Sequence, residues 1–126
     1  MDKQTIGVSN KAAKKAPNEV KAAPRVKRSG CGIASALDLI GDKWTLLIMR
    51  DALFFDCRTF ADFCNRPERI PTNLLSERLK RLVTFGALVK VAYQSKPQRF
   101  EYVPTKLGSE MKPLLIELRA FGDANL

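Results

Sequence analysis

The spacing of apolar residues in the first half of the chain predicts a series of helices separated by short breaks. The first covers 33–40 and ends at Gly41. The second extends from Asp42 to about Phe54, because the Asp42 carboxylate can accept the free amides of a first helical turn and serve as its N-cap. Its expected core residues are Trp44, Leu47, Ile48 and Leu53.

Two further helices follow. A short helix is predicted over 58–63, with Thr59 as its cap, and Pro67 ends it because the residue before a proline avoids the helical conformation. The next helix is expected to begin at Thr72 as its cap and to end at Gly86. The two phenylalanines of the short helix, expected in the core like Trp44, are Phe60 and Phe63.

Beyond residue 86 the pattern changes to that of strands. Segments 87–94 and 99–103 are rich in Val, Tyr and Phe, and the polar segment 95–98 between them predicts a β-hairpin. A last helix, capped by Thr105 and bent at Pro113, is expected from apolar residues at helical spacing: Leu107, Met111, Leu114, Leu115, Leu118 and Phe121. The predicted fold class is therefore mainly α with a small β-hairpin, in the order of a winged helix-turn-helix.

The predicted helix over 72–85 has two different faces. Its apolar face holds Leu74, Leu75, Leu79, Leu82 and Phe85. Its polar face holds Thr72, Asn73, Ser76, Glu77, Lys80, Arg81 and Thr84. Arg78 falls within the apolar sector and therefore needs a carboxylate partner there, for which Asp38, Asp51 and Asp62 are candidates.

Three motifs carry a resemblance to a known family. They are 40–49 (IGDKWTLLIM), 70–80 (IPTNLLSERLK) and 97–108 (PQRFEYVPTKLG). In this order and at these separations they resemble the signature of the HxlR family of bacterial winged-helix transcription regulators, over about residues 31–122. The resemblance implies double-stranded DNA as the partner, with 70–80 as the recognition helix.

A recognition helix needs short polar and basic side chains toward the major groove. The resemblance assigns this role to Thr72, Asn73, Ser76 and Lys80, with Asn73 as the best candidate for pairing with adenine. Lys80 and Arg81 are expected at phosphates, and Glu77 is expected to hold one of them in place. By its composition alone, the same face would equally suit an ordinary solvated helix.

Further DNA contacts are expected outside this helix. At the hairpin tip, or wing, the candidates for the backbone or the minor groove are Lys96, Gln98 and Arg99. Lys43 and Arg58 lie at predicted helix starts, where amides and positive charge favour phosphate. The alternative for the wing is a solvated turn.

The resemblance also implies a homodimer that packs the first and last helices against their symmetry mates. The last helix carries more apolar side chains than one small domain can cover. A two-fold dimer would bind a palindromic operator with half-sites roughly 34–36 Å apart. We expect a repressor of nearby genes.

Charge divides the chain into two regions. Residues 1–30 hold eight Lys or Arg and two acids, and their Ala, Pro and Lys content predicts a basic disordered tail. Residues 31–126 hold 14 basic and 11 acidic residues and are expected to form the DNA-binding and dimerisation domain. The formal net charge of +9 favours a polyanionic partner such as nucleic acid.

The composition of the sequence argues against several classes of protein. It has no apolar run of the roughly 20 residues that a membrane span needs and no apolar signal segment. We therefore expect no membrane partner and a cytoplasmic, nucleoid-associated protein. The absence of histidine removes His-based catalysis and the usual zinc sites. We expect no enzyme activity, no metal and no cofactor.

The three cysteines do not form a disulfide framework. Cys57 and Cys64 are expected to be buried. Cys31 lies beside Lys27, Arg28 and a helix start, where positive charge favours a reactive thiolate. Regulators that the sequence resembles carry a cysteine just before the first helix, and some sense oxidants or electrophiles with it. The resemblance thus makes Cys31 a redox-sensing candidate.

A different class of function also fits the fold. The domain could be a redox-switched protein-interaction module that no longer binds DNA, since fold alone does not fix function. The polar helix face and the basic wing favour DNA binding, and a gel shift over genomic fragments separates the two.

Overall fold

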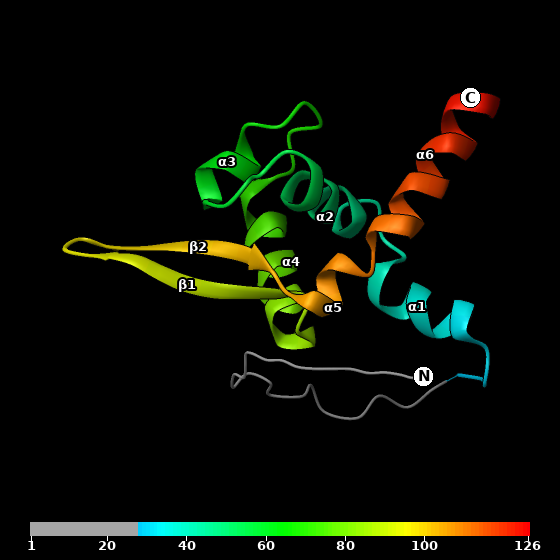
Figure 1. Cartoon of the computed structure of the whole chain (residues 1–126), viewed down its shortest axis with the longest axis horizontal. Helices are drawn as coiled ribbons and strands as arrows, with labels where there is room; N and C mark the ends of the chain where they lie inside the picture. The colour runs from blue at the N-terminus through cyan, green and yellow to red at the C-terminus, as the bar shows by residue number, and fades with distance from the viewer. Residues whose placement is uncertain (1–27) are drawn as a thin grey trace.

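The computed structural model describes residues 28–126 (Figure 1). Lys27 and most of the predicted basic tail lie outside the described residues. The described part contains helices and one antiparallel two-stranded sheet, in the predicted order. The elements are α1 (Gly32–Ile40), α2 (Thr45–Phe54), α3 (Phe60–Cys64), α4 (Thr72–Phe85), β1 (Leu88–Ser95), β2 (Gln98–Pro104), α5 (Lys106–Ser109) and α6 (Lys112–Asn125).

Helix α2 begins two residues later than predicted, at Thr45, with Trp44 rather than Asp42 at the N-cap position. Asp42 still serves its first turn, because Asp42 Oδ1 accepts the amides of Trp44 at 2.8 Å and Thr45 at 3.0 Å. The Thr45 hydroxyl donates to Asp42 Oδ2 at 2.6 Å. Asp42 therefore closes a polar turn that leads into the helix, and Trp44 occupies the N-cap position.

Helix α3 confirms one cap and corrects one core prediction. The Thr59 hydroxyl accepts the Asp62 amide, and the Asp62 carboxylate accepts the Thr59 amide in return, which forms a capping box. Phe63 is buried as predicted, but Phe60 is 37% exposed. Phe60 is the first residue of a five-residue helix, and only the ring one turn later reaches the core.

Helix α4 begins and ends at the predicted residues, but Thr72 is not its cap. The N-cap is Pro71, and Thr72 is the first helical residue without a side-chain capping bond. Pro71 has φ of −58° and ψ of 140°, an extended conformation of the kind that an N-cap residue adopts before the first helical turn. At the other end Gly86 has φ of 102°, a left-handed conformation that glycine adopts without strain.

Strands β1 and β2 pair from Leu88 opposite Pro104 to Ser95 opposite Gln98. The Thr105 hydroxyl then accepts the Gly108 amide and caps α5, as predicted. The expected single, bent last helix is instead two helices. Pro113 lies in the first turn of α6, where its missing amide breaks no helical hydrogen bond, so it starts a helix rather than bending one.

The core lies between α2, α4 and the base of the hairpin. Its most completely buried large side chains are Met49, Phe63, Leu75, Leu79, Leu82 and Leu88. Trp44 is half-buried against this core and Cys57 is buried within it, whereas Cys64 is only partly covered. Figure 1 shows the hairpin projecting on the side opposite to α1 and α6. Among the described residues, no helix is both long and apolar enough to cross a bilayer.

Candidate nucleic-acid interface

The exposed face of α4 presents the residues that were predicted to read DNA. The side chains on it are Thr72, Asn73, Ser76 and Lys80, all exposed. The opposite face carries Leu75, Leu79 and Leu82, each fully buried. Because the burial of this apolar face fixes the rotation of α4, the polar side chains point to solvent as a group.

A buried carboxylate fixes the loop that leads into α4. Asp51, only 4% exposed, accepts Arg50 Nε at 2.9 Å and Arg66 Nε at 3.1 Å. Arg50 also binds Glu68 through two parallel hydrogen bonds of 3.0 and 2.8 Å. The hydrogen bond from Arg50 holds the pKa of Glu68 below its ordinary value. This network ties α2 to the 65–71 loop, and the pattern of hydrophobic residues gave no sign of these pairings.

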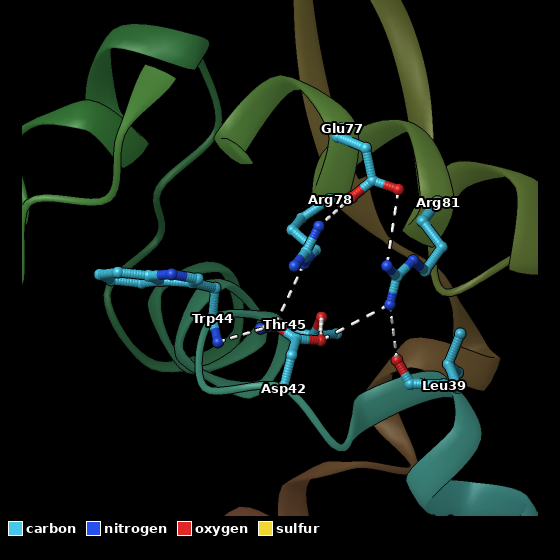
Figure 2. A network of polar contacts seen from close by, with 7 residues as sticks. All are labelled: Leu39, Asp42, Trp44, Thr45, Glu77, Arg78 and Arg81. Atoms are coloured by element: carbon cyan, nitrogen blue, oxygen red, sulfur yellow. Dashed lines mark hydrogen bonds and ion pairs between the residues drawn. The ribbon is translucent and has the colours of Figure 1, made fainter. Parts of the chain in front are cut away.

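Arg78 is held inside the protein, as predicted, but by a different carboxylate. Its Nε lies 3.1 Å from Asp42 Oδ1, and its Nη1 donates to Glu77 Oε1 (Figure 2). The three proposed partners are engaged elsewhere: Asp38 pairs with Arg28, Asp51 with Arg50 and Arg66, and Asp62 caps α3. Asp42 was not considered as a partner because it had been assigned as a cap. The two oxygens of a carboxylate can accept more hydrogen bonds than a cap requires, so Asp42 can serve both roles.

Arg81 belongs to the same group of contacts. Its Nη1 donates to the Leu39 carbonyl at 3.2 Å and lies 3.5 Å from Asp42 Oδ2, while its Nη2 lies 3.5 Å from Glu77 Oε2. We call Asp42, Thr45, Glu77, Arg78, Arg81 and the Leu39 carbonyl the Asp42 cluster. Glu77 thus bridges the two arginines, in agreement with the expectation that it holds a neighbouring cation.

The electrostatics of the Asp42 cluster favour an ionised carboxylate. Burial raises the pKa of Asp42, but hydrogen bonds from the Thr45 hydroxyl, the Trp44 amide and Arg78 outweigh burial and hold it well below its ordinary value. Conversely, the hydrogen bond to Asp42 raises the pKa of Arg78. The cluster is a stable arrangement of opposite charges rather than a site of acid–base chemistry.

The wing carries exposed basic and polar side chains at its tip. Lys96, Gln98 and Arg99 are all exposed, and the Gln94 side chain donates to the carbonyls of Lys96 and Pro97. Nearer the body, Lys90 Nζ lies 4.5 Å from the centre of the Phe100 ring. The tip is therefore tied to its own strand and presents its charges away from the body.

The two cations predicted at helix starts differ in their surroundings. Lys43 is exposed, with Nζ 5.2 Å from the centre of the Trp44 ring. Arg58 Nη1 instead donates to the carbonyls of Ala52 and Cys57, both at 2.9 Å. Lys43 is free to reach a phosphate, whereas Arg58 is occupied in closing the α2–α3 connection.

The three thiols also lie in different surroundings. Cys31 is exposed at the N-cap position of α1, and its amide donates to Ser29 Oγ. The nearby Arg28 pairs with Asp38 at 2.8 Å. Cys57 is buried, and burial raises its pKa. Of the three, Cys31 is the most accessible to a reagent from solvent. Within residues 28–126 no group of His, Cys, Asp or Glu is arranged to hold a metal ion.

Comparison with known proteins agrees with this geometry. A family model described as HxlR-like helix-turn-helix matches residues 39–126. An uncharacterized HTH-type transcriptional regulator of Mycobacterium tuberculosis is 40% identical over 97 residues, which cover 77% of this chain and 60% of the relative. The chain thus spans about 60% of the length of this relative.

Solved structures share the fold. The crystal structure of PA1607, a proposed transcription factor, is 36% identical in sequence. Its TM-score is 0.72 over 79% of this chain and 68% of its own. The redox regulator HypR in its oxidized form is 25% identical, with a TM-score of 0.67 over 76% of this chain and 98% of its own.

Proposed function

The chain belongs to the HxlR-like helix-turn-helix family, and from this premise we propose that it is a sequence-specific DNA-binding transcriptional regulator. The observation that carries the proposal is the exposed polar face of α4. Thr72, Asn73, Ser76 and Lys80 share this face, while buried leucines fix its direction. Such a helix fits the major groove and offers donors and acceptors to base edges.

In this proposal Asn73 reads a base, because its carboxamide can pair with both the N6 and the N7 positions of adenine. Thr72 and Ser76 bind base edges or phosphate, and Lys80 binds phosphate. We assign Arg81 and Arg58 to holding the fold rather than to DNA, because their guanidinium groups already have partners within the protein.

The wing supplies the second contact. Lys96, Gln98 and Arg99 would lie along the backbone or in the minor groove, where the negative potential attracts arginine. Lys43 would add a phosphate contact from the α2 side. These contacts add affinity and fix orientation, while α4 supplies the discrimination between sequences.

We propose a homodimer through α1 and α6. Both helices expose apolar side chains that a folded monomer would leave in water: Ile33, Leu37, Leu114, Ile116, Leu118 and Phe121. Figure 1 places α1 and α6 on the side away from the wing, so a partner there leaves the DNA-facing elements accessible. A two-fold dimer would bind a palindromic operator with half-sites about 34–36 Å apart.

Regulation by a thiol completes the proposal. The accessible Cys31 lies at the start of α1, so an adduct there would disturb the proposed dimer interface. The similarity to a redox regulator supports this assignment. We propose that the protein represses nearby genes in the cytoplasm and releases DNA when Cys31 reacts with an oxidant or an electrophile.

The test is selection of duplexes from a random-sequence library by the purified dimer. The proposal predicts enrichment of one palindrome, and sequencing of retained genomic fragments should place it beside the regulated genes. A library that remains random after several rounds would reject sequence-specific binding and favour the interaction-module alternative.

A further inference from the structure

The Arg81 guanidinium connects three parts of the fold that are distant in sequence (Figure 2). It lies on α4, donates to the Leu39 carbonyl near the end of α1, and pairs with Asp42 in the α1–α2 connection. Asp42 in turn binds Arg78, one residue beyond Glu77 on α4. The helix proposed to read DNA is thereby linked by polar contacts to a helix proposed to form the dimer.

The connection between α1 and α2 is tightly packed, which fixes the position of Asp42 relative to the end of α1. The Gly41 amide donates to the Leu37 carbonyl at 2.8 Å, and a Cβ on Gly41 would lie 2.4 Å from that same oxygen. Leu39 and Ile40, the last two residues of α1, are both buried. Asp42 is therefore held in a defined place relative to the end of α1.

We propose that Asp42 is a positioning residue, which acts with Arg81 to fix α4 relative to α1 and hence relative to the second copy's recognition helix. This inference rests on the proposed function, because it takes α4 as the reading helix and α1 as part of the dimer interface. Asp42 itself touches no DNA. It determines the separation and tilt with which two α4 helices meet two half-sites.

Because Asp42 is negatively charged, positioning and simple electrostatics predict opposite changes in operator affinity when the charge is removed. Removing a carboxylate from a DNA-binding protein reduces repulsion from phosphate, so simple electrostatics predicts equal or tighter binding. Positioning predicts the opposite for the operator, because misplaced helices cannot engage both half-sites together. Nonspecific binding, which needs no register, should not weaken.

The experiment compares Asp42→Asn with wild type on the duplex that wild type enriches, on a scrambled duplex, and on versions with one base pair inserted or deleted between half-sites. Asparagine keeps an oxygen for the Trp44 and Thr45 amides but loses the charge that pairs with the arginines. We expect at least a tenfold loss on the enriched duplex, no loss on the scrambled one, and a flattened dependence on spacing. A matched control is Asp56→Asn, whose side chain is exposed and whose left-handed φ of 54° asparagine tolerates.

Arg81→Lys provides a second variant that keeps the positive charge but cannot span Leu39, Asp42 and Glu77 as the planar fork does. Because lysine keeps the charge, a role for Arg81 at a phosphate alone predicts nearly wild-type affinity for both duplexes and an unchanged dependence on salt. Loss of positioning also leaves the salt dependence of binding unchanged, but it reduces the ratio of the affinities for the enriched and scrambled duplexes. Thermal melts check that each variant folds, and light scattering checks that it dimerises. If Asp42→Asn does not fold, the Arg81→Lys variant alone tests the proposal.

If both variants keep the wild-type ratio of affinities and the wild-type dependence of affinity on half-site spacing, the inference is overturned and the proposed function still stands. A wild type that enriches no sequence would overturn the proposed function, and this inference with it.

Discussion

Arg78 and Asp42 form an ion pair across 36 positions of sequence, with 3.1 Å between Nε and Oδ1. Their side chains are 16% and 23% exposed. The pair joins the middle of α4 to the connection before α2. A basic residue on the helix that we propose to read DNA therefore serves the protein's own structure.

Arg78→Ala should destabilise the fold by about 2 kcal/mol, because it removes a charged hydrogen-bond partner from a partly buried carboxylate. Lys80→Ala, on the exposed face of the same helix, should change stability by less than about 0.5 kcal/mol. Chemical denaturation of both variants measures the difference. An Arg78→Ala protein with wild-type stability and no DNA binding would assign Arg78 to the DNA interface instead.

Acid should weaken the fold through its paired carboxylates. Hydrogen bonds hold the pKa values of Asp42 and Asp62 below the ordinary value of 3.8, so each stabilises the folded state at neutral pH. This contribution is lost as pH falls below about 5, because the unfolded chain then takes up protons that the folded chain does not.

The difference in the free energy of unfolding between wild type and Asp42→Asn should therefore be largest at pH 7 and should narrow as pH falls through about 4 toward 3, where the unfolded carboxylate takes up a proton and the folded one stays ionised. Denaturant titrations at several pH values test this, with the exposed Asp56→Asn as control. A gap between wild type and Asp42→Asn that stays constant down to pH 3 would argue against an ionised Asp42 as the source of the stability.

The sequence predicted the elements better than it predicted their partners. Gly86 predicted the end of α4, and three leucines at helical spacing predicted which of its faces is buried. Periodicity did not place Phe60 outside the core, since a five-residue helix has too few positions to define a face. Nor did it separate α5 from α6, because proline is compatible with either a bend or a helix start.

Long-range polar contacts were the least predictable part of the site. The presence of Arg78 in an apolar sector required a carboxylate, but sequence spacing contains no information on which acid lies nearest in space. Asp42 had already been assigned to a cap. The Asp51 pairing with Arg66 was missed for a related reason, because it depends on how the 65–71 loop folds back onto α2.

Lys96→Ala and Arg99→Ala should each weaken DNA binding almost uniformly across sequences. Each removes one exposed charge from the tip of the wing, so the slope of log affinity against log salt should fall by about one. Gln98→Ala is a neutral control at the same tip and should leave the slope unchanged. Unchanged slopes for both basic variants would place the wing outside the interface.

Cys31→Ser should bind DNA as wild type does under reducing conditions and should resist release by oxidants. The thiol is exposed at the start of α1, whereas burial raises the pKa of Cys57 and lowers its reactivity. Cys57→Ser and Cys64→Ser should release DNA as wild type does. Retention of DNA by wild type after full thiol modification would exclude Cys31 as the sensor.

Asn73→Ala should lose discrimination between sequences and cost about 1–3 kcal/mol on the enriched duplex. The reason is the exposed carboxamide near the start of α4, where a base contact would be made. Affinities for enriched and scrambled duplexes at one salt concentration give the result. An equal loss on both would mean that Asn73 binds only the backbone.

The most direct test of the central claim is the ratio of wild-type affinities for the enriched and scrambled duplexes, measured by competition at physiological salt. Sequence-specific reading by α4 predicts a ratio of at least about 10³, as specific DNA-binding proteins reach. It also predicts that Asn73→Ala reduces this ratio at least about fivefold, which corresponds to the lower end of the expected ~1–3 kcal/mol. A wild-type ratio near one would mean that the basic charge alone binds DNA, and it would contradict the assignment of α4 as a reading helix.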